Sequence, residues 1–373
     1  MIFNEIKYQD PATKTYLGSP SIIRLDNGDL LATHDYFGTG CPRNHEDEEH
    51  LTSVYRSSDD GKTWTNVTHI ANAFWSNLFK HSGDVYLLGT SQQYGSIVIR
   101  RSEDNGNTWT HPKDEKTGLL FRGGERREPP NYHCAPVPIL RKDERLFRAF
   151  EDCNPCQWGT GFQSLVISVD EDADLLDSSN WTMSNKLPYD PSWTPEEWGT
   201  LERPGWLEGN VVESPGGEIW NILRFNSTPI VDKAAIVKVS SDGRCISFDP
   251  EKDFIQFPGG MTKFSIRYDP VTHLYLTLSN NNTVPDWSKQ RNVLSLHVSQ
   301  NLIHWQHKKM LIEDDLDISQ EDSLRYTGFQ YVDWQFDGED IIYIVRTAYD
   351  GAHNFHDANR ITFHKLEKFR CIL

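Results

Sequence analysis

Basic residues and long apolar runs are both scarce in this sequence. The chain has 37 Lys and Arg against 54 Asp and Glu, which gives a formal net charge of −17. Nucleic acid and anionic membrane surfaces bind to a basic face of a protein, so this balance disfavours both as partners. No segment approaches the roughly 20 apolar residues of a membrane span, and MIFNEIKYQD lacks the basic start and apolar run of a signal peptide. We therefore expect a cytoplasmic protein.

Cysteine is also scarce, and its spacing does not suit a structural zinc site. The chain has six cysteines, of which only Cys153 and Cys156 form a CxxC pair. A zinc site built from cysteines needs a second pair at suitable spacing, which is absent from the sequence. Reduced thiols in a loop are the simplest interpretation of Cys153 and Cys156, and redox or metal chemistry at this pair is the alternative.

Aromatic and turn-forming residues are abundant instead. Aromatic residues make up 12% of the chain, with 12 Trp, and 25 Gly and 19 Pro are spread along it. This composition is typical of many short strands joined by tight turns rather than of a helical bundle. All-β barrels and propellers commonly form single domains of this length, and the stretch 185–204 reads as a surface loop rather than a linker. We expect one domain over residues 1–373.

A short motif repeats along the chain. SSDDGKTW (57–64) and SEDNGNTW (102–109) both fit S-x-D-x-G-x-T-W and begin 45 residues apart. Asp and Ser side chains in such a turn bond local backbone amides, and Gly takes a positive φ. Weaker copies occur at 240–243 and 299–305, and 168–181 looks like a copy with an insertion. A repeat near this period predicts a propeller, with the motif as the turn between the outer two strands of a blade.

Pairs of alternating apolar runs accompany these turns. Six such hairpins can be read from the sequence, and IFNEIKY near the N-terminus is expected to pair with the last blade and close the ring. A seventh blade could lie in the interval between Ser168 and Trp206. The expected fold is therefore all-β, a six- or seven-bladed propeller of four-stranded antiparallel blades.

Polar residues recur at one position of the predicted blades. Six positions after the first residue of each second strand stand, in chain order, Asp35, Thr90, Glu151, Arg224, Ser279 and Arg346. Equivalent strand ends gather around one face of a propeller axis, so these residues are expected to become neighbours. Arg224 and Arg346 follow apolar runs and could together bind a carboxylate bidentately. The alternative is that this position only marks where each strand leaves the sheet for solvent.

The first strands and the last loop add further candidates. They are Tyr132, His133, Glu208, Asn210, Lys263, Gln330 and Asp333 on the first strands, and His356 in the segment HNFHDANRITFH. The first strands line the central channel, where polar groups must be paired or face water. A lone His there is more often a hydrogen-bonded structural residue than a catalyst. The His-rich segment fits no compact zinc motif, so no metal ligands are assigned.

Seven runs carry a resemblance to a known family. SPSIIRLDNGDLLATHDYFG, TSVYRSSDDGKTW, YGSIVIRRSEDNGNTWT, YHCAPVP, GWLEGNVV, FQYVDW and HDANRITFH resemble the sialidase-like propellers of bacteria, over nearly the whole chain. Within that group the sequence is most similar to enzymes acting on terminal L-rhamnose linked to glucuronate, described as L-rhamnose-α-1,4-D-glucuronate lyases or as α-L-rhamnosidases. The resemblance implies seven blades and cleavage of a terminal sugar from an acidic glycan. It implies no required cofactor, although such folds can hold a structural calcium ion.

The lyase resemblance implies a catalytic histidine early in the chain, and His34 matches it best. β-Elimination needs a base for the C5 proton, a cation to neutralise the uronate and an acid for the leaving oxygen. The expected roles are His34 as base, Arg148, Arg224 or Arg346 as the cation, and Tyr132 or His133 as the acid. Tyr132 and Arg148, on facing strands, are expected to share a pocket.

Two other functions are compatible with the same residues. An exo-acting hydrolase, an α-L-rhamnosidase or a sialidase-like enzyme, needs two carboxyl groups flanking the bond, and Glu151, Glu208 and Asp333 are the candidates. True sialidases use three arginines, an acidic acid/base and a Tyr activated by Glu, and carry Arg-Ile-Pro near the start. The corresponding place here reads SPSI (19–22), which disfavours sialic acid cleavage. The other alternative is a catalytically silent glycan-binding propeller.

Overall fold

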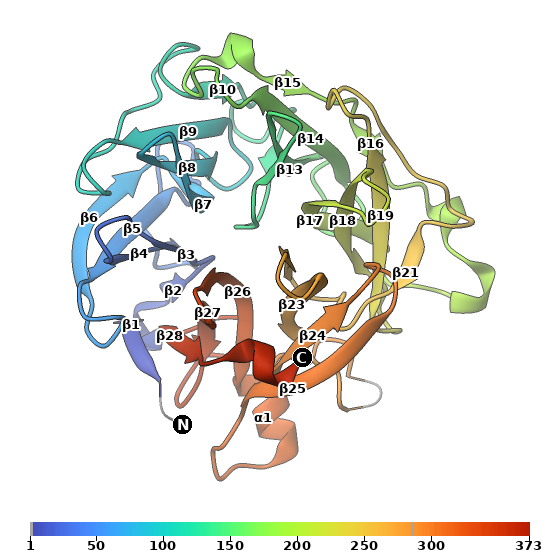
Figure 1. Cartoon of the computed structure of the whole chain (residues 1–373). Coiled ribbons are helices and arrows are strands. Elements are labelled where there is room, and N and C mark those ends of the chain that lie inside the picture. Colours follow the sequence, from blue (N-terminus) through green and yellow to red (C-terminus); the bar gives the residue numbers. More distant parts are fainter. Residues whose placement is uncertain (1–2, 285–286) are drawn as a thin grey trace.

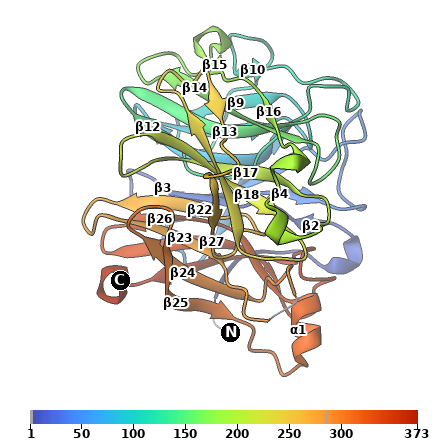
Figure 2. The same ribbon diagram turned by 90° about the vertical axis from the view of Figure 1, so that its right-hand side faces the viewer.

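Six β-sheets surround a common axis in the structure, a computed structural model that describes residues 3–284 and 287–373 (Figure 1). The sheets follow one another clockwise in Figure 1, from the blue first blade at the left to the red last blade at the bottom. Figure 2 shows the ring from its edge, with the third blade at the top and α1 near the bottom. The strands within each blade pair antiparallel, so the chain forms a propeller.

The first half of the chain forms three blades. Blade 1 contains β2 (Tyr16–Leu17), β3 (Ser21–Arg24), β4 (Leu30–Phe37), β5 (Leu51–Ser57) and β6 (Thr65–Ala71). Blade 2 contains β7 (Phe74–His81), β8 (Asp84–Thr90), β9 (Ile97–Ser102) and β10 (Leu119–Phe121). Blade 3 contains β11 (Tyr132–His133), β12 (Leu140–Lys142), β13 (Arg145–Cys153), β14 (Phe162–Asp170), β15 (Thr182–Met183) and β16 (Leu187–Pro188).

The second half forms the other three blades. Blade 4 contains β17 (Gly205–Glu213), β18 (Ile219–Asn226), β19 (Lys233–Val239), β20 (Ile246–Ser247) and β21 (Phe254–Gln256). Blade 5 contains β22 (Ser265–Asp269), β23 (Leu274–Asn280), β24 (Val293–Ser299) and β25 (Trp305–Glu313). Blade 6 contains β26 (Gly328–Asp337), β27 (Asp340–Ala348), β28 (Arg360–Leu366) and the N-terminal β1 (Asn4–Tyr8).

Helices are short and lie in the connections. They are η1 (Pro11–Thr13), η2 (Ser178–Asn180), η3 (Pro191–Trp193), η4 (Glu196–Trp198), α1 (Gln320–Tyr326) and η5 (Phe369–Ile372). Within the described residues, none of these helices is long and apolar enough to cross a membrane.

The propeller expected from the sequence is confirmed, with six blades rather than seven. The interval 168–206 contains the end of β14, the short strands β15 and β16 and three short 3-10 helices, and β15 and β16 both pair with β14 of blade 3. The residues read as a hidden seventh blade therefore complete the third one. The expected closure is also confirmed, because β1 pairs with β28 and makes the N-terminal strand the outer edge of blade 6.

The repeated motif forms the predicted turns. Gly61 and Gly106 each take a positive φ, and their N–H groups donate to Ser57 Oγ at 2.9 Å and Ser102 Oγ at 2.7 Å. The Trp64 indole then packs on Phe363 of blade 6, with ring centroids 5.6 Å apart. The turn thus fixes the outer strands of blade 1 and anchors them to the neighbouring blade.

Apolar residues on both faces of each central strand pack the blades together. In β27, Ile341, Tyr343 and Val345 lie in one buried cluster with strands of blade 5. Ile342 and Ile344, the alternating residues, lie in a second cluster with strands of blade 1. Strands buried on both faces read as continuous apolar runs, which explains the sequence IIYIV. Each fully buried side chain of this kind stabilises the fold by about 1.5–3 kcal/mol.

A ring of polar contacts near the propeller axis joins neighbouring blades. Asp333 of blade 6 accepts hydrogen bonds from Ser21 Oγ at 2.7 Å and from the N–H of Ile22 at 2.9 Å. The N–H of Leu78 in blade 2 donates to the same Ser21 Oγ at 3.0 Å. These bonds connect blade 6 to blade 1 and blade 1 to blade 2.

The ring continues through blades 3 and 4. The Arg148 Nε donates to Asn77 Oδ1 at 3.0 Å, which joins blades 2 and 3. The N–H of Gly209 donates to Glu151 Oε1 at 3.2 Å, which joins blades 3 and 4. Because buried polar groups require partners, the polar groups of the channel bond one another across blades. These bonds hold the blades in register.

Blade 5 completes the ring. Asn210 of blade 4 donates from Nδ2 to the Phe264 carbonyl at 3.0 Å and accepts at Oδ1 from the N–H of Ile266 at 3.2 Å. Lys263 Nζ donates to the Val332 carbonyl of blade 6 at 2.6 Å. Burial lowers the pKa of Lys263 to about 8, so the ammonium is retained at neutral pH where these contacts need its protons.

Candidate functional site

Three innermost strands contain a β-bulge at the same place. The register shifts between Phe74 and Asn77 in β7, between Leu207 and Asn210 in β17, and between Gln330 and Asp333 in β26. In each bulge a large side chain stands on a residue with positive φ, namely Trp75 (47°), Glu208 (56°) and Tyr331 (53°). Such residues are strained unless the surroundings hold them, and bulges re-aim side chains next to functional sites.

Two of the bulge residues meet across the axis. Tyr331 Oη donates to Glu208 Oε1 at 2.6 Å, although the two lie 123 positions apart in the sequence. Burial, followed by the negative charge of Glu208, raises the pKa of Tyr331 to about 12. Arg224 Nη1 donates to the second oxygen, Glu208 Oε2, at 2.8 Å. Burial opposes ionisation of Glu208, but Arg224, His133 and the Tyr331 hydrogen bond together outweigh it and lower the pKa of this carboxyl, which is therefore an anion at neutral pH.

Three arginines surround this pair. Arg224 bonds Glu208 directly, Arg291 Nη1 donates to Gln330 Oε1 at 2.7 Å, and the Arg346 guanidinium carbon lies 4.9 Å from the centre of the Tyr331 ring. Each guanidinium also lies against an aromatic ring, of Trp158, Phe355 and Phe37 respectively. Aromatic faces and single hydrogen bonds orient the three groups and leave other N–H donors open.

The arginines form a buried positive site. In the described part of the chain, the Nε atoms of Arg224, Arg291 and Arg346 are buried without a hydrogen-bond partner. Burial and the nearby charge of Arg224 lower the pKa of Arg291 to about 9, and burial lowers that of Arg346. Asp35, Asp357 and Glu208 act on Arg346 with opposite charge, while the unpartnered Nε atoms leave N–H donors that can bind an anion.

A histidine and a second carboxylate lie next to the Glu208 group. His133 Nδ1 lies 2.8 Å from Glu151 Oε2, and both side chains are buried. The His133 ring packs on Trp75 at 4.3 Å between ring centroids and stacks on Tyr94 at 5.9 Å. A carboxylate that fixes one ring nitrogen sets the tautomer and orientation of the other, which is the arrangement of a proton-transfer group.

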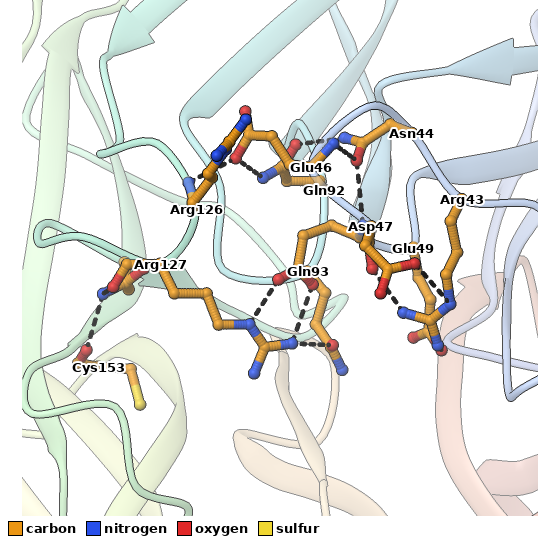
Figure 3. A network of polar contacts seen from close by, with 12 residues as sticks. Arg43, Asn44, Glu46, Asp47, Glu49, Gln92, Gln93, Arg126, Arg127 and Cys153 are labelled. Carbon is orange, nitrogen blue, oxygen red and sulfur yellow. Dashed lines mark hydrogen bonds and ion pairs between the residues drawn. The ribbon is translucent and has the colours of Figure 1, made fainter.

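Loops of blades 1, 2 and 3 form a polar wall beside this group (Figure 3). Arg127 bonds both oxygens of Glu48, at 2.5 Å and 2.9 Å, and Gln93 Oε1 at 3.0 Å. Its guanidinium carbon lies 5.2 Å from the centre of the Tyr94 ring, which in turn stacks on His133. The wall therefore connects directly to the aromatic side of the site.

Several residues expected from the sequence do meet here. The structure brings together His133, Glu151, Glu208, Arg224 and Arg346, which come from blades 3, 4 and 6. His356 lies at their edge, because its backbone carbonyl accepts from Arg346 Nη2 at 2.5 Å. The grouping of second-strand ends around the axis thus predicted much of the cluster.

His34 lies elsewhere. Its ring is buried between Tyr36, at 4.7 Å, and Tyr55, at 5.4 Å, and its Nδ1 bonds the Asp35 carbonyl at 3.0 Å. Burial lowers the pKa of His34 to about 4. Successive side chains of a strand point to opposite faces, so Asp35 points toward Ser19 and Trp75, whose N–H groups it binds, while His34 enters the core. This packing does not favour His34 as a base acting on substrate.

Tyr132 and Arg148 do not share a pocket, contrary to expectation. In the observed register Tyr132 pairs with Asp152, four residues beyond Arg148, and its ring lies in the apolar cluster between blades 2 and 3. Arg148 is fully buried and bonds the carbonyls of Ala135 and Ala149. Alternation and register therefore separate two side chains that the hairpin alone suggested as neighbours.

Four further candidates hold the scaffold. Asn210, Lys263 and Asp333 belong to the ring of contacts between blades described above. Gln330 donates to the Phe355 carbonyl at 2.6 Å and accepts from Arg291, so it positions that arginine. These residues act on the site through their neighbours.

The His-rich loop forms an internal network. His353 Nδ1 and His356 Nδ1 lie 2.7 Å and 2.9 Å from the two oxygens of Asp357. Among residues 3–284 and 287–373, no group of three or more His, Cys, Asp or Glu side chains is arranged to hold a metal ion. No ligands for a structural calcium ion are therefore named.

Tyr331, Arg291 and Trp75 are site residues that sequence reasoning missed. Tyr331 stands in the quoted run FQYVDW, but strict alternation would turn it away from the channel, and only the bulge re-aims it. Arg291 lies just before β24, outside the six aligned positions. A sequence interpretation that assumes unbroken alternation of side chains along a strand therefore misses residues that stand on bulges.

Separate cavities lie away from the Tyr331 group. One of about 570 Å³ is lined by residues such as Ile139, Val212, Tyr268 and Phe336, near the turns at the opposite ends of the inner hairpins. Another of about 440 Å³ is lined by Tyr16, Phe37 and His353 among others. The second cavity shares Phe37 with the surroundings of Arg346, so it extends the site toward blade 1.

Comparison with known proteins gives structural neighbours only. No protein-family model and no curated protein matches the sequence. An α-L-arabinanase from Penicillium chrysogenum, complexed with arabinobiose, is 16% identical with a TM-score of 0.59 over 100% of this chain and 99% of its own. The chain has the sialidase-like propeller fold.

Two further neighbours agree with this fold. An α-L-arabinofuranosidase from Fusarium graminearum is 14% identical with a TM-score of 0.58, over 97% of each chain. An intramolecular trans-sialidase from Ruminococcus gnavus, in complex with oseltamivir carboxylate, is 13% identical with a TM-score of 0.56, over 99% of this chain and 98% of its own. At such identities the similarity establishes the fold, and function has to be argued from the site.

Proposed function

We propose that this protein is an exo-acting glycoside hydrolase that removes a carboxylate-bearing sugar from the end of an acidic glycan. The observation that carries the proposal is the set of three buried arginines, each with an unpartnered Nε, around the hydrogen-bonded pair of Tyr331 and Glu208. The arginines would bind the sugar carboxylate, and the pair would act at its anomeric carbon.

The chemistry follows from the charges. A carboxylate next to the anomeric centre repels an anionic nucleophile, whereas a phenol is neutral until it reacts. Tyr331 Oη would attack the anomeric carbon while its proton passes to Glu208, which is ionised and hydrogen-bonded to it. Sialidases with a Tyr nucleophile are known exceptions to the use of two carboxylates in glycosidases. True sialidases use three arginines and carry Arg-Ile-Pro near the start. The corresponding segment here, SPSI (19–22), has no arginine, and Arg346 of blade 6 would serve as the third one.

The leaving oxygen needs a proton, and His133 is the group we assign to this step. It lies in the same buried cluster, and Glu151 fixes its Nδ1. His133 would donate the proton to the leaving sugar and then take one from the water that hydrolyses the tyrosyl intermediate.

Elimination from a rhamnosyl-glucuronate end is a second candidate. The paired His133 and Glu151 could remove the C5 proton while the arginines neutralise the uronate, as β-elimination requires. In this version His133 takes the role first expected of His34. Hydrolysis is favoured because elimination gives no role to a Tyr and Glu pair held on two strained bulges.

The test is a substrate panel on the whole protein. Aryl glycosides of N-acetylneuraminate, D-glucuronate and L-arabinofuranose, with a rhamnosyl-glucuronate glycan, are assayed for released sugar and for the ultraviolet absorbance of an unsaturated uronate. We expect release without absorbance, at least about 100-fold faster for a carboxylated sugar than for arabinofuranose. Absorbance rising with release would mean elimination, and a preference for neutral arabinofuranose would overturn the arginine assignment.

Variants connect the activity to the named pair. Tyr331→Phe and Glu208→Gln should each lower kcat by about 10³-fold or more, since they remove the nucleophile or its base. Tyr268→Phe is the matched control, because Tyr268 is 44% exposed and its hydroxyl lies 3.0 Å from His273 Nδ1, outside the proposed site. Binding of acidic glycans without turnover by any variant or the parent protein would instead indicate the glycan-binding alternative.

A further inference from the structure

The CxxC pair lies at the edge of the proposed site. Cys153 is the last residue of β13 and is fully buried, and Cys156 follows in the loop to β14, where it is partly exposed. Each thiol shifts the pKa of the other, so the two sulfurs lie close together. Both pack in one small cluster with Phe162, Leu207 and Tyr94.

The loop from Cys153 to β14, which contains Cys156, is closed by backbone hydrogen bonds. The N–H of Asn154 donates to the Gly161 carbonyl at 2.8 Å, and the N–H of Gly161 donates to the Gln157 carbonyl at 2.9 Å. The same loop carries Trp158, whose ring lies 5.8 Å from the guanidinium carbon of Arg224. A change in the bonding of the two sulfurs would therefore act on a residue that contacts the arginine site.

The two thiols differ in their surroundings. Contact with Cys153, and then the positive charge of Arg127, lower the pKa of Cys156, whereas the contact with Cys156 and burial raise the pKa of Cys153. Arg127 belongs to the polar wall drawn with Cys153 in Figure 3. A partly exposed thiol beside a cation is the reactive kind, and a buried neighbour within reach can resolve a mixed disulfide.

We propose that Cys153 and Cys156 form a reversible disulfide by exchange with a low-molecular-weight disulfide, and that this bond adjusts the Trp158 loop. The Cys156 thiolate attacks the small disulfide and releases one thiolate. The Cys153 thiol gives its proton to that thiolate and attacks the Cys156 sulfur, which releases a second thiolate that takes up a proton. The protein loses two electrons and two protons, and the small disulfide becomes two thiols.

The chemical test does not depend on catalysis. The whole protein is equilibrated in glutathione buffers of graded oxidised fraction, free thiols are blocked, and the peptide with both cysteines is measured by mass spectrometry. We expect this peptide to lose two hydrogen atoms reversibly. Cys156→Ser should abolish the bridge, and Cys153→Ser should leave Cys156 as a glutathione adduct. A peptide that remains fully reduced, or an adduct on Cys156 of the unaltered protein that never resolves, would overturn the proposal.

The exposed residues Cys245 and Cys371 provide the controls. Cys245→Ser and Cys371→Ser should leave the bridge at Cys153 and Cys156 unchanged. A bridge that vanishes in either variant would mean that intermolecular exchange, and not the CxxC pair, gave the signal.

The effect on activity rests on the proposed function and is read separately. Oxidation should change KM for a carboxylated substrate by about threefold to tenfold, because Trp158 contacts Arg224, and reduction should restore it. In Trp158→Ala the disulfide should form as before while KM becomes independent of oxidation. A disulfide that forms without any change in KM would overturn the proposal that the bond adjusts the Trp158 loop. A reduced protein with no turnover would refute the proposed function, and the disulfide measured by mass spectrometry would still stand.

Discussion

The even-numbered and odd-numbered blades differ in their innermost strands. In blades 2, 4 and 6 this strand is long and unbroken except for one bulge, over β7, β17 and β26. In blades 1 and 3 it is split into two short pieces, β2 with β3 and β11 with β12, and in blade 5 it is the short β22. The two kinds alternate around the ring.

This alternation places the bulges on three of the six blades. The bulges of the even blades direct Trp75, Glu208 and Tyr331 into the site at the cost of a positive φ at each residue. In the odd blades, Ser21 on β3 and Lys263, just before β22, bond the neighbouring blades. Strained residues persist only where surrounding structure holds them, so regular contacts on both sides of each bulged strand are what such a site requires.

His133 tests this comparison of the blades, because it is a site residue that lies on β11 of an odd blade. His133→Ala should lower kcat on the best carboxylated substrate by about 10²–10³-fold, since the proton donor is lost. His34→Gln, in the other split blade, is the control and should keep kcat within about threefold of the parent.

The arginines around the bulged strands are tested through substrate binding. Arg291→Ala should raise KM for a carboxylated sugar by about 10- to 100-fold, because a charge-assisted contact is lost, with a smaller change in kcat. Arg122→Ala is the control, since its side chain is 67% exposed and lies on the surface. An equal loss of kcat in both variants would contradict a specific role for Arg291.

Asn210 tests the scaffold beside a bulge. Asn210→Ala leaves the buried Phe264 carbonyl and the Ile266 N–H without partners and should lower the free energy of unfolding by about 3 kcal/mol. Asn27→Ala, in an exposed turn, should change it by less than about 0.5 kcal/mol. Urea unfolding measures both, and equal stabilities would mean that the blades do not depend on this link.

His34 should affect the pH dependence of stability. Its folded pKa is about 4, below the unfolded value of 6.5, so its contribution is present above pH 6.5 and is lost as the pH falls toward 4. Between pH 7 and pH 5 this loss amounts to about 2 kcal/mol. In His34→Gln the decline of unfolding free energy over this range should be smaller by that amount, and an unchanged slope would contradict the burial of a neutral ring.

The propeller could be read from the sequence because its signals are local. S-x-D-x-G-x-T-W specifies a turn through its own side chains, and apolar runs such as IIYIV report strands buried on both faces. The count of six hairpins was right, and the possible seventh blade is excluded because the short strands β15 and β16 pair with β14 of blade 3, which only the tertiary structure shows.

The site was predictable only in part. Arg224, Arg346 and Glu151 follow from their common position on the second strands, because equivalent strand ends converge on the axis. His34 and Tyr132 could not be placed, since a shift of one residue moves a side chain from the channel to the core. The chain by itself determined the blades, their turns and a ring of polar strand ends. Tertiary structure alone decided which strands bulge, and thereby brought Tyr331, Glu208 and the three arginines together, because a bulge depends on contacts with neighbouring blades that no local pattern contains.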